Sequence, residues 1–300
     1  MRYLIVLLST LTICFAAQAR QEEDELPAAE DLMVLAFPKW ADDTEGRLQS
    51  ITLNKMSRAW DGGAPRKAKT RKVIVQPQFV TRLGPKRVSL IAKLLPASDD
   101  GTAEAAHVTP LGVAAYIFDT SSSGWKLVAR QEPFALHGLF AEAQLTHVEL
   151  ARGRPAVLVE YGSCWQGYCN DWITLYEFNS KGVNTKPVLE QTLKADNLGA
   201  LHGCPERLWS VLPGLRASDY VDEDEKRLAA ERRCISVRGM WRVEPSDREP
   251  GDFAIDFKGA RSESLRGAPQ PAEKIEQSVR FVYRKGKYEL ESGENPAPAF

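Results

Sequence analysis

The stretch that decides the fold is residues 112–130, which read GVAAYIFDTSSSGWKLVAR. Two short runs rich in valine, isoleucine and aromatic residues, 112–119 and 125–130, flank the turn-forming residues 121–124. β-branched and aromatic runs joined by a serine–glycine turn are typical of an antiparallel hairpin. This stretch therefore predicts a β protein.

Runs of similar composition lie on both sides of this hairpin, at 87–95, 154–161, 171–178 and 279–284. Turn-forming residues follow at 179–182 and at 285–287, where residues 283–290 have the pattern of a compact hairpin. The sequence therefore predicts an all-β, mainly antiparallel fold.

A weak internal similarity relates two parts of the chain. Residues 83–91 resemble 150–158, and residues 116–119 resemble 176–179. The similarity predicts repeated units of four strands at 78–132, 144–190 and 234–291. Such units favour a propeller-like arrangement, with a two-sheet sandwich as the alternative. Chance similarity between hairpins is a further explanation.

One helix is expected near 219–233. Ser218 or Asp219 can cap its start, acidic residues follow at 222–225, and basic residues lie at its end. This order of charges offsets the helix dipole. We interpret the charged run as a solvated helix face.

The two ends of the chain differ from the β-rich part. Arg2, the apolar stretch from Leu4 and the small residues at 17–19 predict a secretory signal peptide, 1–19. We expect an acidic disordered leader over 20–31, a single β-rich body over 32–291 and a proline-rich tail over 292–300. No other stretch has the apolar length of a membrane span, so a periplasmic or secreted protein is expected.

The charge balance and the motifs exclude several classes of protein. The chain has 39 basic and 40 acidic residues, which argues against a nucleic-acid-binding protein. No nucleotide or calcium motif occurs, and the histidines lack the spacing of metal ligands, so neither a cofactor nor a metal is expected.

Four cysteines remain after signal cleavage: Cys164, Cys169, Cys204 and Cys234. An even number in an oxidising compartment predicts two disulfides. The most local pairing joins Cys164 to Cys169 and Cys204 to Cys234, and two other pairings are possible.

The residues Gly162-Ser163-Cys164-Trp165 resemble the nucleophile segment of papain-family cysteine proteases. The resemblance covers four residues and implies a thiol nucleophile at Cys164. However, Tyr161 stands where that family has a cysteine, and the last histidine, His202, comes too early for its catalytic histidine. A disulfide with Cys169 would also occupy the thiol, so we do not assign a protease.

Residues 164–172 predict a disulfide-linked hairpin tip that presents Trp165, Tyr168 and Trp172. Rigid aromatic side chains lose little entropy on binding and suit carbohydrate, peptide or protein surfaces. Alternatively, the three rings fill a core layer below the turn. The leading hypothesis is an exported, non-enzymatic binding or interaction protein whose ligand, an envelope polymer or protein, is unknown.

The alternative function is a hydrolase that acts on envelope glycans or peptides with paired carboxylates. A glycosidase needs two acidic side chains about 5–10 Å apart across a cleft. The sequence offers several candidates and does not show which of them converge: Glu142, Glu149, Glu160, Asp171 and Glu177.

Overall fold

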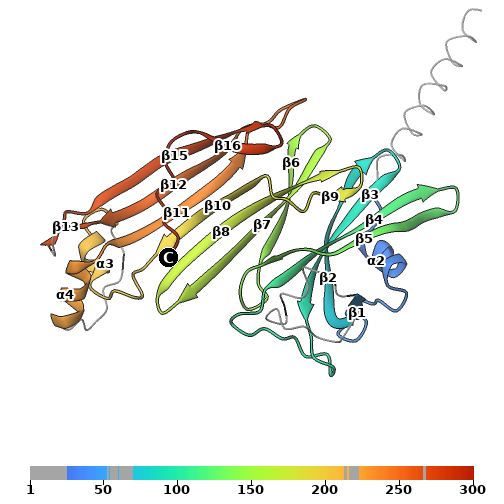
Figure 1. Cartoon of the computed structure of the whole chain (residues 1–300), viewed down its shortest axis with the longest axis horizontal. Coiled ribbons are helices and arrows are strands. Elements are labelled where there is room, and N and C mark those ends of the chain that lie inside the picture. Colours follow the sequence, from blue (N-terminus) through green and yellow to red (C-terminus); the bar gives the residue numbers. More distant parts are fainter. Residues whose placement is uncertain are drawn as a thin grey trace, which may run out of the picture.

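The computed structural model describes residues 26–52, 54, 60, 70–212, 215, 223–265 and 268–300. The molecule is elongated, with one sheet at one end and a larger sheet along the rest of its length (Figure 1). All strand pairs in these ranges are antiparallel, which confirms the predicted all-β class. The predicted signal peptide lies outside the described residues.

The smaller sheet has five strands in sequential order. Its fourth strand is buried on both faces from Leu111 to Phe118, which explains its continuous apolar run. The strands are β1 (Leu48–Thr52), β2 (Thr70–Gly84), β3 (Arg87–Pro96), β4 (Leu111–Ser121) and β5 (Gly124–His137).

A short helix, α2 (Ala29–Ala36), covers one face of the five-stranded sheet (Figure 1). Leu32 and Met33 are fully buried in the same cluster as Val75 of β2 and Leu90 of β3. The acidic leader predicted over 20–31 therefore runs into an ordered helix. The apolar side chains that follow the acidic residues anchor this helix, so its first turn is ordered as well.

The larger sheet has nine strands in the order β16-β15-β12-β11-β10-β8-β7-β6, with β9 paired to β8. The strands are β6 (Gln144–Ala151), β7 (Arg154–Trp165), β8 (Tyr168–Asn179), β9 (Gly182–Val183), β10 (Leu189–Asp196), β11 (Cys234–Val243), β12 (Phe253–Ser262), β15 (Glu273–Arg284) and β16 (Lys287–Ser292).

The two sheets pack against each other through β3–β5 and β7–β8. Ile91 and Val113 of the smaller sheet share a buried cluster with Val157 and Val159 of the larger one. Over this region the two sheets pack as the layers of a sandwich do, while most of the larger sheet extends beyond the smaller one (Figure 1). Segments 144–190 and 234–291 are parts of one continuous sheet rather than separate propeller blades.

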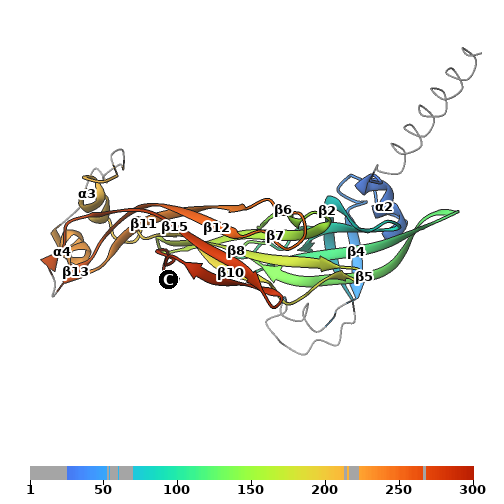
Figure 2. The same ribbon diagram turned by 90° about the horizontal axis from the view of Figure 1, so that it is seen from above.

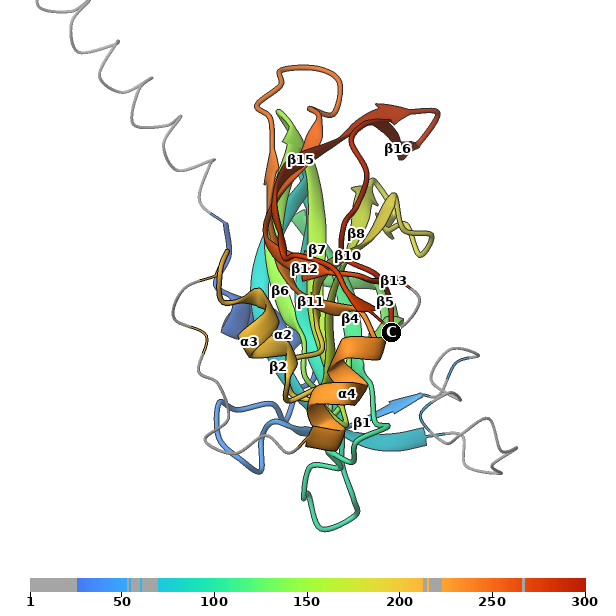
Figure 3. The same ribbon diagram turned by 90° about the vertical axis from the view of Figure 1, so that its left-hand side faces the viewer.

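Two further helices, α3 (Cys204–Leu208) and α4 (Glu223–Glu231), lie at the end of the molecule opposite α2 (Figure 2). The short pair β13 (Ser264–Leu265) and β14 (Ala268–Pro269) lies beside them. We call these four elements the helical cap; it faces the viewer in Figure 3. The helix predicted near 219–233 is confirmed by α4.

None of the helices in the described ranges has both the length and the apolar character that crossing a membrane requires.

Candidate functional site

Both disulfides of the most local pairing are present. Cys164 and Cys169 are directly opposite each other on β7 and β8, near the tip of the hairpin. Cys204 and Cys234 join the start of α3 to the start of β11 and are fully buried. No cysteine of these pairs carries a free thiol, so the structure gives no support to a thiol nucleophile at Cys164.

The hairpin between β7 and β8 ends in a two-residue turn. Gln166 and Gly167 have φ angles of 49° and 80°. Two consecutive positive φ angles are typical of the type I′ turn that matches the twist of a hairpin. A Cβ at Gly167 would lie 2.1 Å from the carbonyl carbon of Gly199, so the turn rests directly on the backbone after β10.

The three predicted aromatic residues lie in three different environments. Trp165 is 59% exposed and has its ring 4.7 Å from that of His107. Tyr168 lies against Phe300, with 5.3 Å between ring centroids. Trp172 stacks on Tyr161 at 5.7 Å and is partly buried. A binding role for these residues stays a prediction, and Trp165 is the ring most open to solvent.

Trp165 belongs to a group of rings from three separate segments. His107 comes from the connection between β3 and β4, and Phe140 comes from the connection between β5 and β6. The rings of His107 and Phe140 are 5.0 Å apart, and Phe140 is 47% exposed. We call His107, Phe140 and Trp165 the aromatic cluster. Sequence reasoning missed His107 and Phe140, because no local pattern relates these distant segments to the hairpin.

A cleft of about 660 Å³ lies next to the hairpin, between the two sheets. Gln76 and Lys93 line it from the smaller sheet. Residues 160–162 of β7, Asp171 of β8 and residues 141–144 line it from the other side. We call this space the inter-sheet cleft. The aromatic cluster adjoins it, because Phe140 directly precedes the residues that form its wall.

The cleft brings together three of the five carboxylates considered from the sequence: Glu142, Glu160 and Asp171. Glu160 pairs with Ile173 and Gly162 pairs with Asp171, so Glu160 and Asp171 are diagonal neighbours on adjacent strands. Diagonal neighbours have Cα atoms about 7–8 Å apart, within reach of a shared ligand.

The other two carboxylates have structural roles. Glu149 accepts a hydrogen bond from the backbone N–H of Gly153 at 2.8 Å, inside the turn between β6 and β7. Glu177 forms an ion pair with Arg154 and accepts a 2.6 Å hydrogen bond from the hydroxyl of Tyr283. These contacts explain both residues without a ligand.

Lys93 is the one cation among the residues that line the cleft. Burial lowers the pKa of its ammonium group, and the nearby Glu142 opposes that shift. The residues that line the cleft therefore include three acidic side chains and one basic side chain.

A buried polar pair supports the wall of the cleft. The imidazole of His137 is joined to the hydroxyl of Tyr176 by a 2.7 Å hydrogen bond, and its ring lies 4.7 Å from that of Tyr161. Burial lowers the pKa of His137 to about 4, so the imidazole is neutral at pH 7. The pair fixes Tyr161, which in turn stacks on Trp172.

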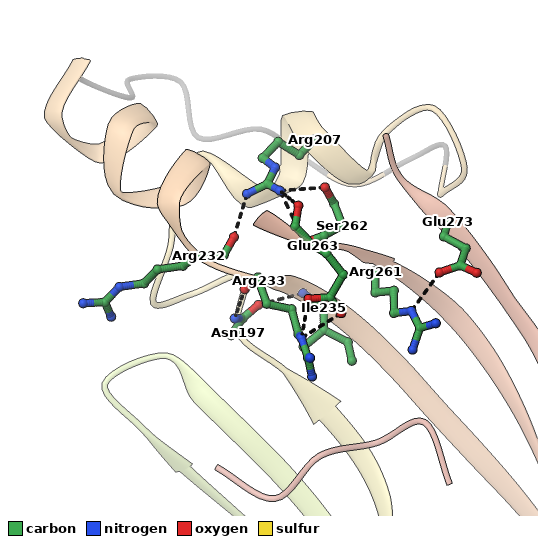
Figure 4. Close-up of polar contacts among 9 residues, drawn as sticks. All are labelled: Asn197, Arg207, Arg232, Arg233, Ile235, Arg261, Ser262, Glu263 and Glu273. Atoms are coloured by element: carbon green, nitrogen blue, oxygen red, sulfur yellow. Dashed lines mark hydrogen bonds and ion pairs between the residues drawn. The ribbon is translucent and has the colours of Figure 1, made fainter. Parts of the chain in front are cut away.

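A second polar cluster, in the helical cap, is structural (Figure 4). Arg207 of α3 donates to the carbonyl of Arg232 at 2.8 Å and to the hydroxyl of Ser262 at 2.6 Å. Asn197 accepts from the N–H of Ile235 and donates to the carbonyl of Arg233. These bonds tie the helices to the ends of β10–β12 and give the Arg207 guanidinium a structural role.

Within the described ranges, no group of three or more His, Cys, Asp or Glu side chains is arranged to hold a metal ion. No protein-family model, no curated protein and no solved structure matches this chain. The fold and the site define an all-β, disulfide-linked protein whose hairpin tip adjoins a cleft lined mainly by acidic side chains among its charged residues.

Proposed function

We propose that this chain is an exported, non-enzymatic binding protein that uses the hairpin tip and the inter-sheet cleft. The observation that carries the proposal is the exposure of Trp165, 59% of whose surface is open to solvent. A large aromatic side chain left exposed on a fixed support is typical of a binding surface.

The rigidity of the support adds to this argument. The disulfide between Cys164 and Cys169 joins the two strands just below Trp165, and Gly167 rests on the backbone at Gly199. A preorganised surface loses less conformational entropy when a ligand binds.

The two disulfides also support the location. Disulfides persist in oxidising compartments, which for a bacterial chain means the periplasm or the cell exterior. The ligand in this proposal is an envelope polymer or an envelope protein.

The test compares the unmodified mature chain with Trp165→Ala. Binding of cell-wall glycan fragments and of short synthetic peptides is measured by isothermal titration calorimetry. We expect at least one of these ligands to bind, and Trp165→Ala to weaken it about tenfold or more, a loss typical of an interface hot spot. Binding that is unchanged in Trp165→Ala would refute the proposal.

The second candidate function is a hydrolase that acts on envelope glycans or peptides. It is favoured by the diagonal placement of Glu160 and Asp171 beside the cleft. One carboxylic acid would protonate the leaving group while the other carboxylate activates water or attacks.

Product analysis separates the two candidates. A hydrolase releases new reducing ends from glycans or new amino termini from peptides, and Glu160→Gln and Asp171→Asn each abolish the release. A binding protein leaves both kinds of polymer intact. Release that persists in both variants would exclude these two residues as the catalytic pair.

A further inference from the structure

One edge of β7 is open close to the hairpin tip. β6 pairs with β7 only from Arg154 to Glu160, whereas β8 pairs with β7 up to Trp165. Among the described strands, none pairs with residues 161–165 on the side away from β8. An open edge presents backbone donors and acceptors that can pair with another strand.

The register shows which backbone groups face outwards. Trp165 and Tyr168 flank a two-residue turn, so they form a hydrogen-bonded pair within the hairpin. Because such pairs alternate along antiparallel strands, Gly162 and Cys164 direct their N–H and C=O groups away from β8. The same alternation directs Glu160 towards Gln144, where β6 begins. Gly162 is the next residue after Glu160 whose backbone groups face outwards, and β6 does not pair with it.

The cleft lies beside this open edge and supplies charge. Gly162 lines the cleft, and a Cβ at this position would lie 2.5 Å from Oδ1 of Asp171. The glycine therefore lets the Asp171 carboxylate lie next to the edge. With Glu142 and Glu160 on the same cleft, a strand added here would gain from basic side chains.

The aromatic cluster lies at the far end of the same edge. Trp165 is the last residue of β7, and the ring of His107 lies between it and Phe140. Val108, next to His107, is 76% exposed. An apolar side chain of an added strand would cover these exposed surfaces.

The geometry points to an extended basic peptide that adds as a strand to β7 at residues 161–165. Its basic side chains enter the inter-sheet cleft, and an apolar side chain covers the aromatic cluster. This inference rests on the proposed function, because it uses the same tip and names the class of partner. A glycan has no regular series of amide groups to pair with Gly162 and Cys164, whereas an extended peptide has one.

The experiment titrates the mature chain with three synthetic peptides. The first alternates lysine and valine and ends in phenylalanine. The second has glutamates in place of the lysines, and the third carries N-methyl groups on alternate amides. We expect the lysine peptide to bind, and the other two to bind about tenfold or more weakly, as measured by calorimetry.

Variants of the chain test the same contacts from the other side. Glu160→Gln combined with Asp171→Asn should weaken binding of the lysine peptide about tenfold. The control is Glu276→Gln, which removes an exposed carboxylate from β15, away from the cleft. Thermal unfolding checks that each variant is folded. If the double variant is not folded, the inference is tested by comparing the lysine peptide with the N-methylated peptide on the unmodified chain.

Several outcomes would overturn the inference. Equal binding of the lysine and N-methylated peptides would exclude strand addition. Glycan fragments that bind in a Trp165-dependent way, when no peptide does, would overturn the inference and retain the proposed function. If neither class binds, both fail. A dimer in analytical ultracentrifugation that dissociates in the double variant would assign the edge to a second copy instead.

Discussion

The hairpin tip and the helical cap each contain one disulfide, and the two bonds close loops of very different size. Cys164 and Cys169 are 5 positions apart and already face each other in the β7–β8 register. Cys204 and Cys234 are 30 positions apart and enclose both helices of the cap. The tip disulfide joins two strands that backbone hydrogen bonds also join. The cap disulfide instead holds a helical segment that strand pairing does not hold.

The two disulfides also differ in how deeply their cysteines are buried. Cys204 and Cys234 are fully buried with Leu201, Leu208 and Ala260 in a small apolar cluster. Cys164 is exposed and supports a side chain that faces solvent. The comparison indicates that the cap disulfide serves stability, whereas the tip disulfide serves the shape of a surface.

The largest effect is expected from removing the cap disulfide. Cys204→Ala with Cys234→Ala should lower the free energy of unfolding by roughly 3.5–4 kcal/mol, because the unfolded chain regains the entropy of a 30-residue loop. Urea denaturation under oxidising conditions measures this loss. A loss of stability no larger than that caused by removing the tip disulfide would contradict the stabilising role assigned to the cap disulfide.

Acidic pH should destabilise the region below the tip. The pKa of His137 falls from 6.5 to about 4 on folding, so the unfolded chain takes up the proton first as the pH decreases. Stability that is present above pH 6.5 should therefore be lost between pH 6.5 and 4, by roughly 3 kcal/mol. Denaturation at several pH values measures it.

The control for this pH dependence is His137→Gln, which keeps a hydrogen-bonding side chain and removes the titration. The curve between pH 6.5 and 4 should become less steep, and His147, whose pKa burial also lowers, accounts for part of the slope that remains. An equally steep curve in the variant would assign the acid sensitivity to other groups.

Arg207→Met should destabilise the helical cap by about 2 kcal/mol. The variant removes a charged donor from the carbonyls of Arg232 and Glu263 and from the hydroxyl of Ser262. Hydrogen exchange should report faster opening of the cap, with little change at the tip. Equal acceleration at both ends would show that the two regions open together.

Removing the tip disulfide should cost about 2 kcal/mol or less, since the closed loop is short. Cys164→Ser with Cys169→Ser is the variant, and urea denaturation is the measurement. In the proposed function, ligand affinity should fall in the same variant because Trp165 loses its fixed support. An intact affinity would mean that backbone pairing and the Gly167 contact hold the tip without the bond.

The smallest effect on stability is expected from Trp165→Ala. Its side chain is mostly exposed, so the free energy of unfolding should change by less than about 0.5 kcal/mol. Trp172→Ala is the matched comparison: its ring stacks on Tyr161 and should cost more. Thermal unfolding of both variants separates a surface ring from a structural one.

The strands with dense β-branched and aromatic composition could be predicted from the sequence. The predicted runs 87–95, 112–119 and 171–178 lie within β3, β4 and β8. Strands of the larger sheet that alternate charged and apolar residues, such as β12 with Asp256 and Lys258, were not predicted as separate strands. Their charges face solvent on one side of the sheet and weaken the local apolar signal.

The site was only partly predictable. Cys164, Cys169 and Trp165 are close in the sequence, so their spacing indicated a disulfide-linked tip. The cleft is lined by residues of β2, β3, β7 and β8, and the other rings of the aromatic cluster come from the connections at 107 and 140. Pairing of distant segments sets these contacts, and no periodicity within one segment encodes it.

The contact between Gly167 and the backbone at Gly199 has a practical consequence for biosensor design. A dye at residue 167 would have to displace the main chain after β10 and would distort the surface it is meant to report on. Gln166 occupies the same turn, is exposed, and lies beside Trp165. A fluorophore attached through Gln166→Cys would therefore respond to a bound partner while the contact between Gly167 and Gly199 is retained.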